Sequence, residues 1–393
     1  MTIEHLTSSL QQIMDQAVAA NETAGVNLMV LRDGMELLYA QSGYADKENK
    51  RPIQKDSIFR LYSMSKPITS AAAMILLERG IIDLCDPVSK FLPGFANQKT
   101  YENGVLVSVK RACTIRDLLC MTSGLLYSGA DPAGKAAEAV LNDAISKMDG
   151  PDALSTIEIA NRLGSQPISF HPGDHFMYGT SADILGAVIE IASGMSFGEF
   201  LQKELFDPLG MNDTGFWIPA DKQSRRVLTY EPAADGTLKE FPTTNLDISY
   251  QMDKAPAFES GGAGLASTLP DYARFAAMLI HGGSLDGHTI LKERTVQYMT
   301  NGQLLPWQQE DMWRSWDGLT GYSYGNLLRV CKDPGMAPAI VTKGEYGWDG
   351  WLGPYFSNHP AEGLTILLGM QKRDAGTTSL TRKLRNVILT ELL

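Results

Sequence analysis

The sequence predicts an α+β fold in which one antiparallel sheet is built from both ends of the chain. Apolar runs of strand length occur near both termini, and the middle of the chain has mostly helix and loop patterns. Of the 393 residues, 44% are hydrophobic and 20% are charged, which suits a globular protein with a full core. We therefore expect helices to flank the sheet, with an α/β sandwich domain formed by residues 1–80 and 261–393. Residues 81–260 are expected to form an inserted, mostly helical domain.

The N-terminal part begins with an amphipathic helical pattern and continues into a hairpin. Apolar residues at Leu10, Ile13, Met14 and Ala17 lie on one helix face. Two apolar runs, 26–31 and 35–40, are then joined across Asp33-Gly34, a pair that is typical of tight hairpin turns.

The C-terminal part mirrors this pattern. Residues 351–356 and 364–370 are expected to be strands, and a helix with Leu380, Leu384 and Ile388 on one face follows them. Between the two ends, helical patterns are found at 114–119, 181–190 and 271–279. Because the hairpins lie at opposite ends of the chain, a cleft beside the inserted helices is the expected place for a small-molecule site.

Ser63-x-x-Lys66 is the most informative motif. Residues 57–62 have an extended pattern, and residues 67–79 form an apolar helix that Gly80 ends as a C-cap. A serine and a lysine three residues apart on a helix face the same way. A serine at the positive end of the helix dipole beside a desolvated lysine is a nucleophile with its own base. An ordinary buried helix with a capping serine is the alternative interpretation.

Two further segments carry candidate chemistry. Tyr178 lies in a polar loop directly before a helix, where it would relay a proton to the leaving group. A tyrosine held beside a lysine is expected to titrate at lower pH, although Tyr178 could instead pack its ring at the helix start. The glycines around Trp348 permit a ligand to approach the backbone, and the alternative there is a tight turn.

Rival sites are weaker. Gly194-x-Ser196-x-Gly198 matches a nucleophile elbow, but helical patterns lie on both sides of it instead of a strand and a helix. The histidines that would complete a triad there, His281, His288 and His359, are expected to be surface residues. His171 and His175 lack a third ligand, so no metal site is expected.

Composition excludes some function classes. A formal net charge of −11 argues against a nucleic-acid or anionic-membrane partner. The four cysteines, Cys85, Cys113, Cys120 and Cys331, lack metal-ligand spacing and are expected to be buried thiols. We find no membrane span and no signal-peptide pattern, so we expect a cytoplasmic protein. Oligomeric state is not predicted.

Three motifs in order, Ser63-x-x-Lys66, Tyr178-x-Thr180 and Trp348-Asp349-Gly350, resemble those of the serine β-lactamase and penicillin-recognising superfamily. The chain is most similar to class C β-lactamase-like proteins and family VIII carboxylesterases. Segments 114–125, 208–211 and 261–265 also match, so the resemblance covers nearly the whole chain. It implies the superfamily's α/β sandwich with an inserted helical domain.

The resemblance also implies roles. Ser63 would be the acyl-forming nucleophile, and Lys66 and Tyr178 would share the acid and base work. The backbone N–H groups of Ser63 and Trp351 would form the oxyanion hole. Four residues of the second and third motif regions are expected to contact the substrate, and these are Trp348, Gly350, Thr180 and Tyr355.

Two departures shift the expected substrate. β-Lactamases and D,D-peptidases usually carry Lys-Thr-Gly or His-Thr-Gly where this chain has Trp348-Asp349-Gly350, and loss of the cation weakens carboxylate recognition. Thr180 replaces an asparagine, and a hydroxyl cannot copy both donor and acceptor roles of an amide. A tryptophan in the third motif resembles family VIII esterases and statin-type acyltransferases.

We therefore expect a serine hydrolase without a cofactor, acting through an acyl-enzyme as a carboxylesterase on short-chain esters. Its substrate is expected to be a small ester or β-lactam-like molecule, with weak β-lactamase activity as a side reaction. The alternatives are a β-lactamase or D-amino-acid peptidase, an acyltransferase, and a non-catalytic relative that only binds a ligand.

Overall fold

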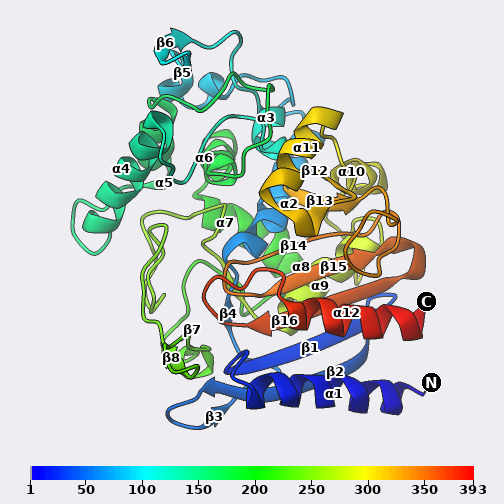
Figure 1. Ribbon diagram of the computed structural model, residues 1–393. Helices are drawn as coiled ribbons and strands as arrows, with labels where there is room; N and C mark the ends of the chain where they lie inside the picture. Colours follow the sequence, from blue (N-terminus) through cyan, green and yellow to red (C-terminus); the bar gives the residue numbers. More distant parts are fainter. Residues whose placement is uncertain (1) are drawn as a thin grey trace.

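The fold is the expected α+β arrangement, and the computed structural model describes residues 2–393 (Figure 1). Its centre is one antiparallel sheet to which both ends of the chain contribute. The two contributions meet where β1 pairs with β16, with Val26 opposite Met370. The strands, in spatial order, are β12 (Tyr322–Gly325), β13 (Leu328–Cys331), β14 (Tyr346–Asp349), β15 (Tyr355–His359), β16 (Leu364–Met370), β1 (Gly25–Arg32), β2 (Met35–Asp46) and β3 (Arg51–Pro52).

The predicted N-terminal hairpin is confirmed. Arg32 pairs with Met35, so Asp33 and Gly34 alone form the turn. Both have positive φ, 50° and 73°, and this is the mirror-image turn whose twist matches that of the flanking strands.

Helices cover both faces of the sheet, and side-chain alternation along the strands divides the core between them. α1 (Ile3–Ala19) and α12 (Ser379–Leu392) pack together on one face. In β1, Val26, Leu28 and Val30 belong to that side, whereas Met29 and Leu31 belong to the opposite core. The opposite core includes residues of α2 (Lys66–Glu78) and α9 (Leu269–Ile280).

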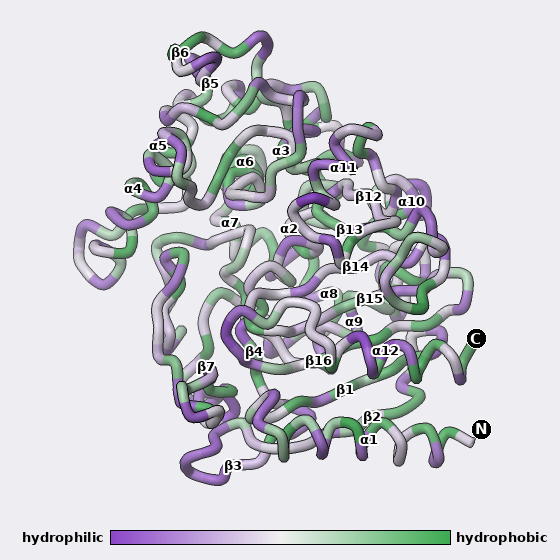
Figure 2. The backbone as a smooth tube through the Cα atoms, viewed as in Figure 1, coloured by the Kyte–Doolittle hydropathy of each residue, from purple (hydrophilic) through white to green (hydrophobic). Residues whose placement is uncertain are grey.

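Helices dominate the middle of the chain, above the sheet in Figure 1. Figure 2 shows that α6 is mostly hydrophobic, whereas hydrophobic and hydrophilic residues alternate along α1. The remaining helices are α3 (Ile115–Cys120), α4 (Pro132–Lys147), α5 (Thr156–Gly164), α6 (Ser181–Ser193), α7 (Phe197–Leu201), α8 (Asp207–Leu209), α10 (Glu293–Met299) and α11 (Pro306–Ser315).

Within residues 2–393, no single helix has both the length and the apolar composition needed to cross a membrane. One pair, Ser181–Ser193 with Phe197–Leu209, passes that test only when joined, and the two parts are bent by 78°.

The last third of the predicted insertion folds back onto the part of the chain that was predicted to form the sandwich domain. Gly215 bridges to Ala266, and Tyr230 bridges to Lys372. The chain also forms short two-stranded pairs, which are β4 (Phe59–Arg60) with β9 (Ala266–Ser267), β5 (Lys99–Glu102) with β6 (Val105–Ser108), β7 (Tyr230–Pro232) with β8 (Leu238–Glu240), and β10 (Ser284–Leu285) with β11 (His288–Thr289).

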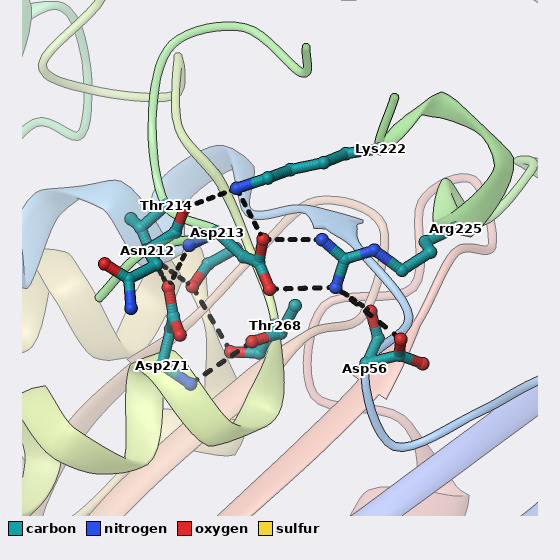
Figure 3. A network of polar contacts seen from close by, with 9 residues as sticks. Asp56, Asn212, Asp213, Thr214, Lys222, Arg225, Thr268 and Asp271 are labelled. Carbon is teal, nitrogen blue, oxygen red and sulfur yellow. Dashed lines mark hydrogen bonds and ion pairs between the residues drawn. The ribbon is translucent and has the colours of Figure 1, made fainter. Parts of the chain in front are cut away.

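A polar network anchors this returning segment beside the β4–β9 pair (Figure 3). Asp213 is its centre: its carboxylate accepts two hydrogen bonds from Arg225, at 2.8 and 2.5 Å. These bonds, with Lys222 at 2.8 Å, lower the pKa of Asp213 to about 2. The Asp213 N–H donates to Asp271 in the first turn of α9, at 2.7 Å. The network therefore ties the loop to the helix that supports the sheet.

Some expectations about elements were wrong. The strand expected at 351–356 starts only at Tyr355, because Trp351–Pro354 forms a turn. Residues 346–349 form strand β14, whereas a tight turn around Trp348 had been the alternative interpretation. Of the four thiols, Cys85 is exposed and the other three are buried.

We predict that Leu384→Ala lowers the free energy of unfolding by about 2–5 kcal/mol. Leu384 is completely buried in the core between α12 and the sheet, so its removal leaves a cavity. Urea denaturation followed by circular dichroism measures the effect. Lys383→Ala, an exposed change on the same helix, is the control, and equal midpoints for the two variants would contradict this packing.

Candidate active site

Ser63 lies in a short 3-10 helix, Tyr62–Ser65, that leads directly into α2. The Leu61 N–H donates to the Leu265 carbonyl at 2.8 Å, so the β4–β9 pair fixes where this turn begins. The first N–H groups of a helix have no partner within it. The Ser63 N–H therefore lies where a developing negative charge would be stabilised.

Tyr62, directly before Ser63, has a left-handed backbone with φ +46°, which is unusual for a bulky residue. This ends the extended segment that the sequence pattern had continued to residue 62. The ring is buried, packs edge-on against Trp351 at 5.1 Å between centroids, and lies 5.5 Å from the Arg60 guanidinium. Packing on both sides holds the strained residue in place.

Lys66 brings its ammonium to the serine. The Nζ atom donates to Ser63 Oγ at 3.0 Å, to the Gly262 carbonyl at 2.8 Å and to the Tyr127 hydroxyl at 3.2 Å. The side chain is completely buried in the first turn of α2. Burial lowers the pKa of Lys66 to about 7, although the negative charges of Asp183 and Asp349 oppose the shift. Lys66 can therefore be neutral and accept a proton near neutral pH.

Tyr178 lies over this pair, at the end of the loop before α6. Its ring centroid is 4.5 Å from Lys66 Nζ, and its hydroxyl accepts a hydrogen bond from the Trp348 indole at 3.0 Å. Burial raises the pKa of Tyr178, although hydrogen bonds with Ser63 and Trp348 oppose the shift. The expectation that Tyr178 titrates at lower pH is wrong, because loss of solvent outweighs the nearby lysine. The phenol keeps its proton near neutral pH.

Gly350 allows the end of β14 to approach the nucleophile. A Cβ there would collide with the Leu61 carbonyl oxygen and lie 2.7 Å from the Pro354 ring. The Trp351 N–H that follows has no hydrogen-bond acceptor among the described residues. This arrangement places a second free N–H next to the Ser63 turn, as an oxyanion hole requires.

These groups open onto a cavity of about 570 Å³. Of the expected site residues, Ser63, Tyr178, Trp348, Gly350 and Trp351 line it. The remaining wall combines aromatic and charged groups, including Trp316, Asp349, Arg329 and Arg385. Arg329 is paired with the buried Glu345 at 2.9 Å. The size suits a small-molecule substrate.

Two residues that were expected to contact the substrate do not line the cavity. Thr180 is completely buried at the start of α6 and does not line the cavity. Tyr355 is also completely buried, and its hydroxyl accepts a hydrogen bond from Arg329 at 2.6 Å. Alternation along β15 turns Tyr355 toward the α12 side of the sheet, behind Arg329, and it does not line the cavity.

Neither Tyr127 nor the role of Gly262 was predicted from the sequence, although Tyr127 follows the matching segment 114–125. Both contact Lys66 Nζ directly. The Gly261-Gly262 pair was the one available signal, because a Cβ on Gly262 would lie 2.8 Å from both Asp183 Oδ2 and the Tyr127 hydroxyl.

The rival serine forms a helix cap. Ser196 Oγ accepts from the Glu199 N–H at 3.2 Å, and the Glu199 carboxylate accepts from the Ser196 N–H at 3.0 Å. His281 and His288 are exposed, whereas His359 is buried, contrary to expectation. Its ring contacts Thr342 and Ser357.

The paired histidines contact separate carboxylates. His171 bonds Glu102 at 2.6 Å, and His175 bonds Asp311 at 2.9 Å. Across residues 2–393, no three His, Cys, Asp or Glu side chains are grouped so that they could hold a metal ion.

A serine in contact with a buried lysine, two free backbone N–H groups and a small-molecule cavity are features of the serine hydrolase class of enzyme. The chain belongs to the Beta-lactamase family, whose profile matches residues 10–388.

Similar proteins cover nearly the whole chain. It is 28% identical to Protein Rv1367c of Mycobacterium tuberculosis over 94% of this chain and 90% of that protein. It is 29% identical to Esterase EstB of Burkholderia gladioli over 92% of this chain and 90% of that protein. The solved structure of "EstCE1, a hydrolase with promiscuous acyltransferase activity" superposes with a TM-score of 0.82 at 24% identity, covering 98% of this chain and 99% of that one.

We predict that labelling of Ser63 by a fluorophosphonate slows as pH falls below about 7, the pKa of Lys66. The base acts only when neutral, so the rate should fall about tenfold for each further pH unit. Labelling rates on either side of pH 7 measure this. Lys66→Met should remove the reaction, and Lys343→Met, at an exposed lysine, should keep the wild-type profile. A rate that stays constant well below pH 7 would exclude Lys66 as the base.

We predict that Gly350→Ala lowers kcat on a p-nitrophenyl ester by about 10²–10³-fold, the cost of one oxyanion donor. The added Cβ would push the turn away from Leu61 and displace the Trp351 N–H. Gly150→Ala is the control, because a Cβ there meets nothing closer than 3.5 Å. A folded Gly350→Ala enzyme with wild-type kcat would refute this oxyanion hole.

Proposed function

We propose that the protein is a carboxylesterase that hydrolyses short-chain esters through an acyl-enzyme on Ser63. The observation that carries this proposal is the 3.0 Å contact between Ser63 Oγ and a completely buried Lys66 Nζ at a cavity that a substrate can enter. A lysine whose pKa is about 7 can take the serine proton without a histidine or a metal.

In the acylation step, Ser63 Oγ attacks the ester carbonyl carbon while neutral Lys66 accepts its proton. The carbonyl oxygen becomes negative between the N–H groups of Ser63 and Trp351. The bond to the alcohol oxygen then breaks. Tyr178, which keeps its proton, donates to that oxygen and is reprotonated from Lys66, so the alcohol leaves neutral.

Deacylation repeats these steps with water. Lys66, neutral again, removes a proton from water through Tyr178 or directly, and the oxygen attacks the acyl carbon. The oxyanion forms in the same place, and the bond to Ser63 Oγ breaks as Lys66 returns the proton to the serine. Free acid and the original enzyme result.

Esters fit the third motif better than β-lactams do. Where related β-lactamases present a cation, this chain has Trp348, whose indole N–H is already donated to Tyr178. Lys343, the nearby lysine in sequence, is exposed and does not line the cavity. Without an ammonium at this position, a substrate carboxylate loses its charge-assisted partner beside the nucleophile.

The relatives support this order of candidates. EstB is named an esterase, and EstCE1 is named a hydrolase with acyltransferase activity. Acyl transfer to an alcohol is therefore the second candidate, because an alcohol in the cavity could replace water in deacylation. β-Lactamase or D-amino-acid peptidase activity ranks below it. A protein that only binds its ligand would not require a buried lysine aligned on a serine.

We predict that a p-nitrophenyl ester acylates Ser63 and turns over rapidly, whereas nitrocefin turns over slowly. Ser63→Ala should abolish both the adduct and turnover, because among the described residues Ser63 is the one serine, threonine or cysteine whose side chain contacts Lys66 Nζ. Intact-mass spectrometry with peptide mapping locates the adduct. Ser196→Ala, which alters only a helix cap, is the matched control and should keep both.

The outcomes separate the candidates. Fast nitrocefin turnover would favour the β-lactamase alternative, and faster turnover on adding an alcohol would favour acyl transfer. An adduct on Ser196, or turnover by Ser63→Ala, would overturn the proposal.

A further inference from the structure

Asp183 is a buried carboxylate that the steps above do not use. It lies in the first turn of α6, five residues after Tyr178, with 4% of its surface exposed. Its Oδ1 atom accepts hydrogen bonds from the Ser260 hydroxyl and from the Gly262 N–H, the latter at 2.9 Å. Burial and the negative charge of Asp183 together raise the pKa of the Tyr127 hydroxyl. A carboxylate costs considerable free energy to bury unless such donors surround it.

The groups that Asp183 holds are those that hold Lys66. The Gly262 N–H points to Asp183 while the carbonyl of the same residue accepts from Lys66 Nζ at 2.8 Å. Tyr127 interacts electrostatically with Asp183, and its hydroxyl accepts from Nζ at 3.2 Å. One carboxylate therefore fixes two of the three hydrogen-bond partners of the ammonium, and the third is Ser63 Oγ.

The sequence permits this close arrangement only because residue 262 is glycine. A Cβ there would lie 2.8 Å from Asp183 Oδ2 and 2.8 Å from the Tyr127 hydroxyl. Both contacts are too short, so a side chain at 262 would separate the carboxylate from the loop that it orients.

We propose that Asp183 is a positioning residue for the base, fixing Lys66 Nζ against Ser63 through the Gly262 peptide and the Tyr127 hydroxyl. It supplies the orientation and fixed negative charge that the buried acid gives to the base in other hydrolytic sites. This inference rests on the proposed function, because it needs Lys66 to be the base.

The charge of Asp183 has a second consequence. Four titratable groups face Lys66, and these are Tyr127, Tyr178, Asp183 and Asp349. Both tyrosines keep their protons, since burial raises their pKa values. Desolvation lowers the pKa of Lys66, and the negative charge of Asp183 opposes this shift more strongly than that of Asp349. Removing that charge disfavours the protonated lysine, so the base should stay neutral at lower pH.

The test compares Asp183→Asn with wild type by fluorophosphonate labelling across pH. Asparagine keeps an oxygen for Ser260 and Gly262 but loses the charge and one acceptor. We expect the acid limb of the labelling rate to move down by about one pH unit, the lower end of the effect of a nearby opposite charge. The maximal rate should fall, by about 10²-fold if Lys66 shifts by about 1 Å.

Two comparisons make the result decisive. Asp149→Asn removes an equal charge at an exposed site and should leave the profile unchanged. Asp183→Ala should lose more activity than Asp183→Asn, and circular dichroism identifies any variant that fails to fold. A folded Asp183→Asn enzyme with the wild-type acid limb and rate overturns the inference. If wild type is labelled at no serine, or not at Ser63, the proposed function itself fails, and this outcome is distinct.

Discussion

The burial of one lysine side chain is the constraint on which the site depends. Lys66 has no exposed surface, and no carboxylate of the described chain lies within ion-pair distance of it. A buried ammonium needs hydrogen-bond acceptors around it, and Ser63, Tyr127 and Gly262 supply them. Because these three come from separate parts of the chain, the helix, the loop before α4 and the segment before β9 must all be in place before the serine is activated.

The sheet topology makes this assembly precise. Joining strands from both ends of the chain in one sheet places β14 beside the turn that carries Ser63, although almost 290 residues separate the two in sequence. Gly350 lets the two backbones touch at Leu61. The Asp213 network then fixes the returning loop to α9, close to the β4–β9 pair that precedes Ser63.

The sequence predicted what depends on local pattern. The terminal hairpin, the buried helix after Ser63 and the order of the three motifs follow from spacing and turn residues, and the structure has them. Strands β12 to β14 were missed because Tyr322–Gly325 and its neighbours are short and carry no clear alternation. Boundaries of the two predicted domains stay a prediction.

The parts of the site that were missed or misassigned depend on distant contacts. Tyr127 and Asp183 lie far from Lys66 in sequence and come close to it only in the folded chain. No motif spacing therefore predicts them. The pKa of Tyr178 depends on how completely the surrounding aromatic rings exclude water. The sequence does not show how these rings pack. A shift of one residue at the start of α6 would change whether Thr180 faces the cavity. A shift of one residue along β15 would do the same for Tyr355.

Three of the six tryptophans of the chain, Trp316, Trp348 and Trp351, line the one cavity onto which Ser63 opens. Two of these indoles, moreover, donate hydrogen bonds, to Tyr178 and to Asp374. Entry of a ligand replaces water around these rings, so half of the tryptophans sense occupancy at once. The enzyme thus carries a built-in optical reporter of its own active site, and binding can be followed in the unlabelled protein.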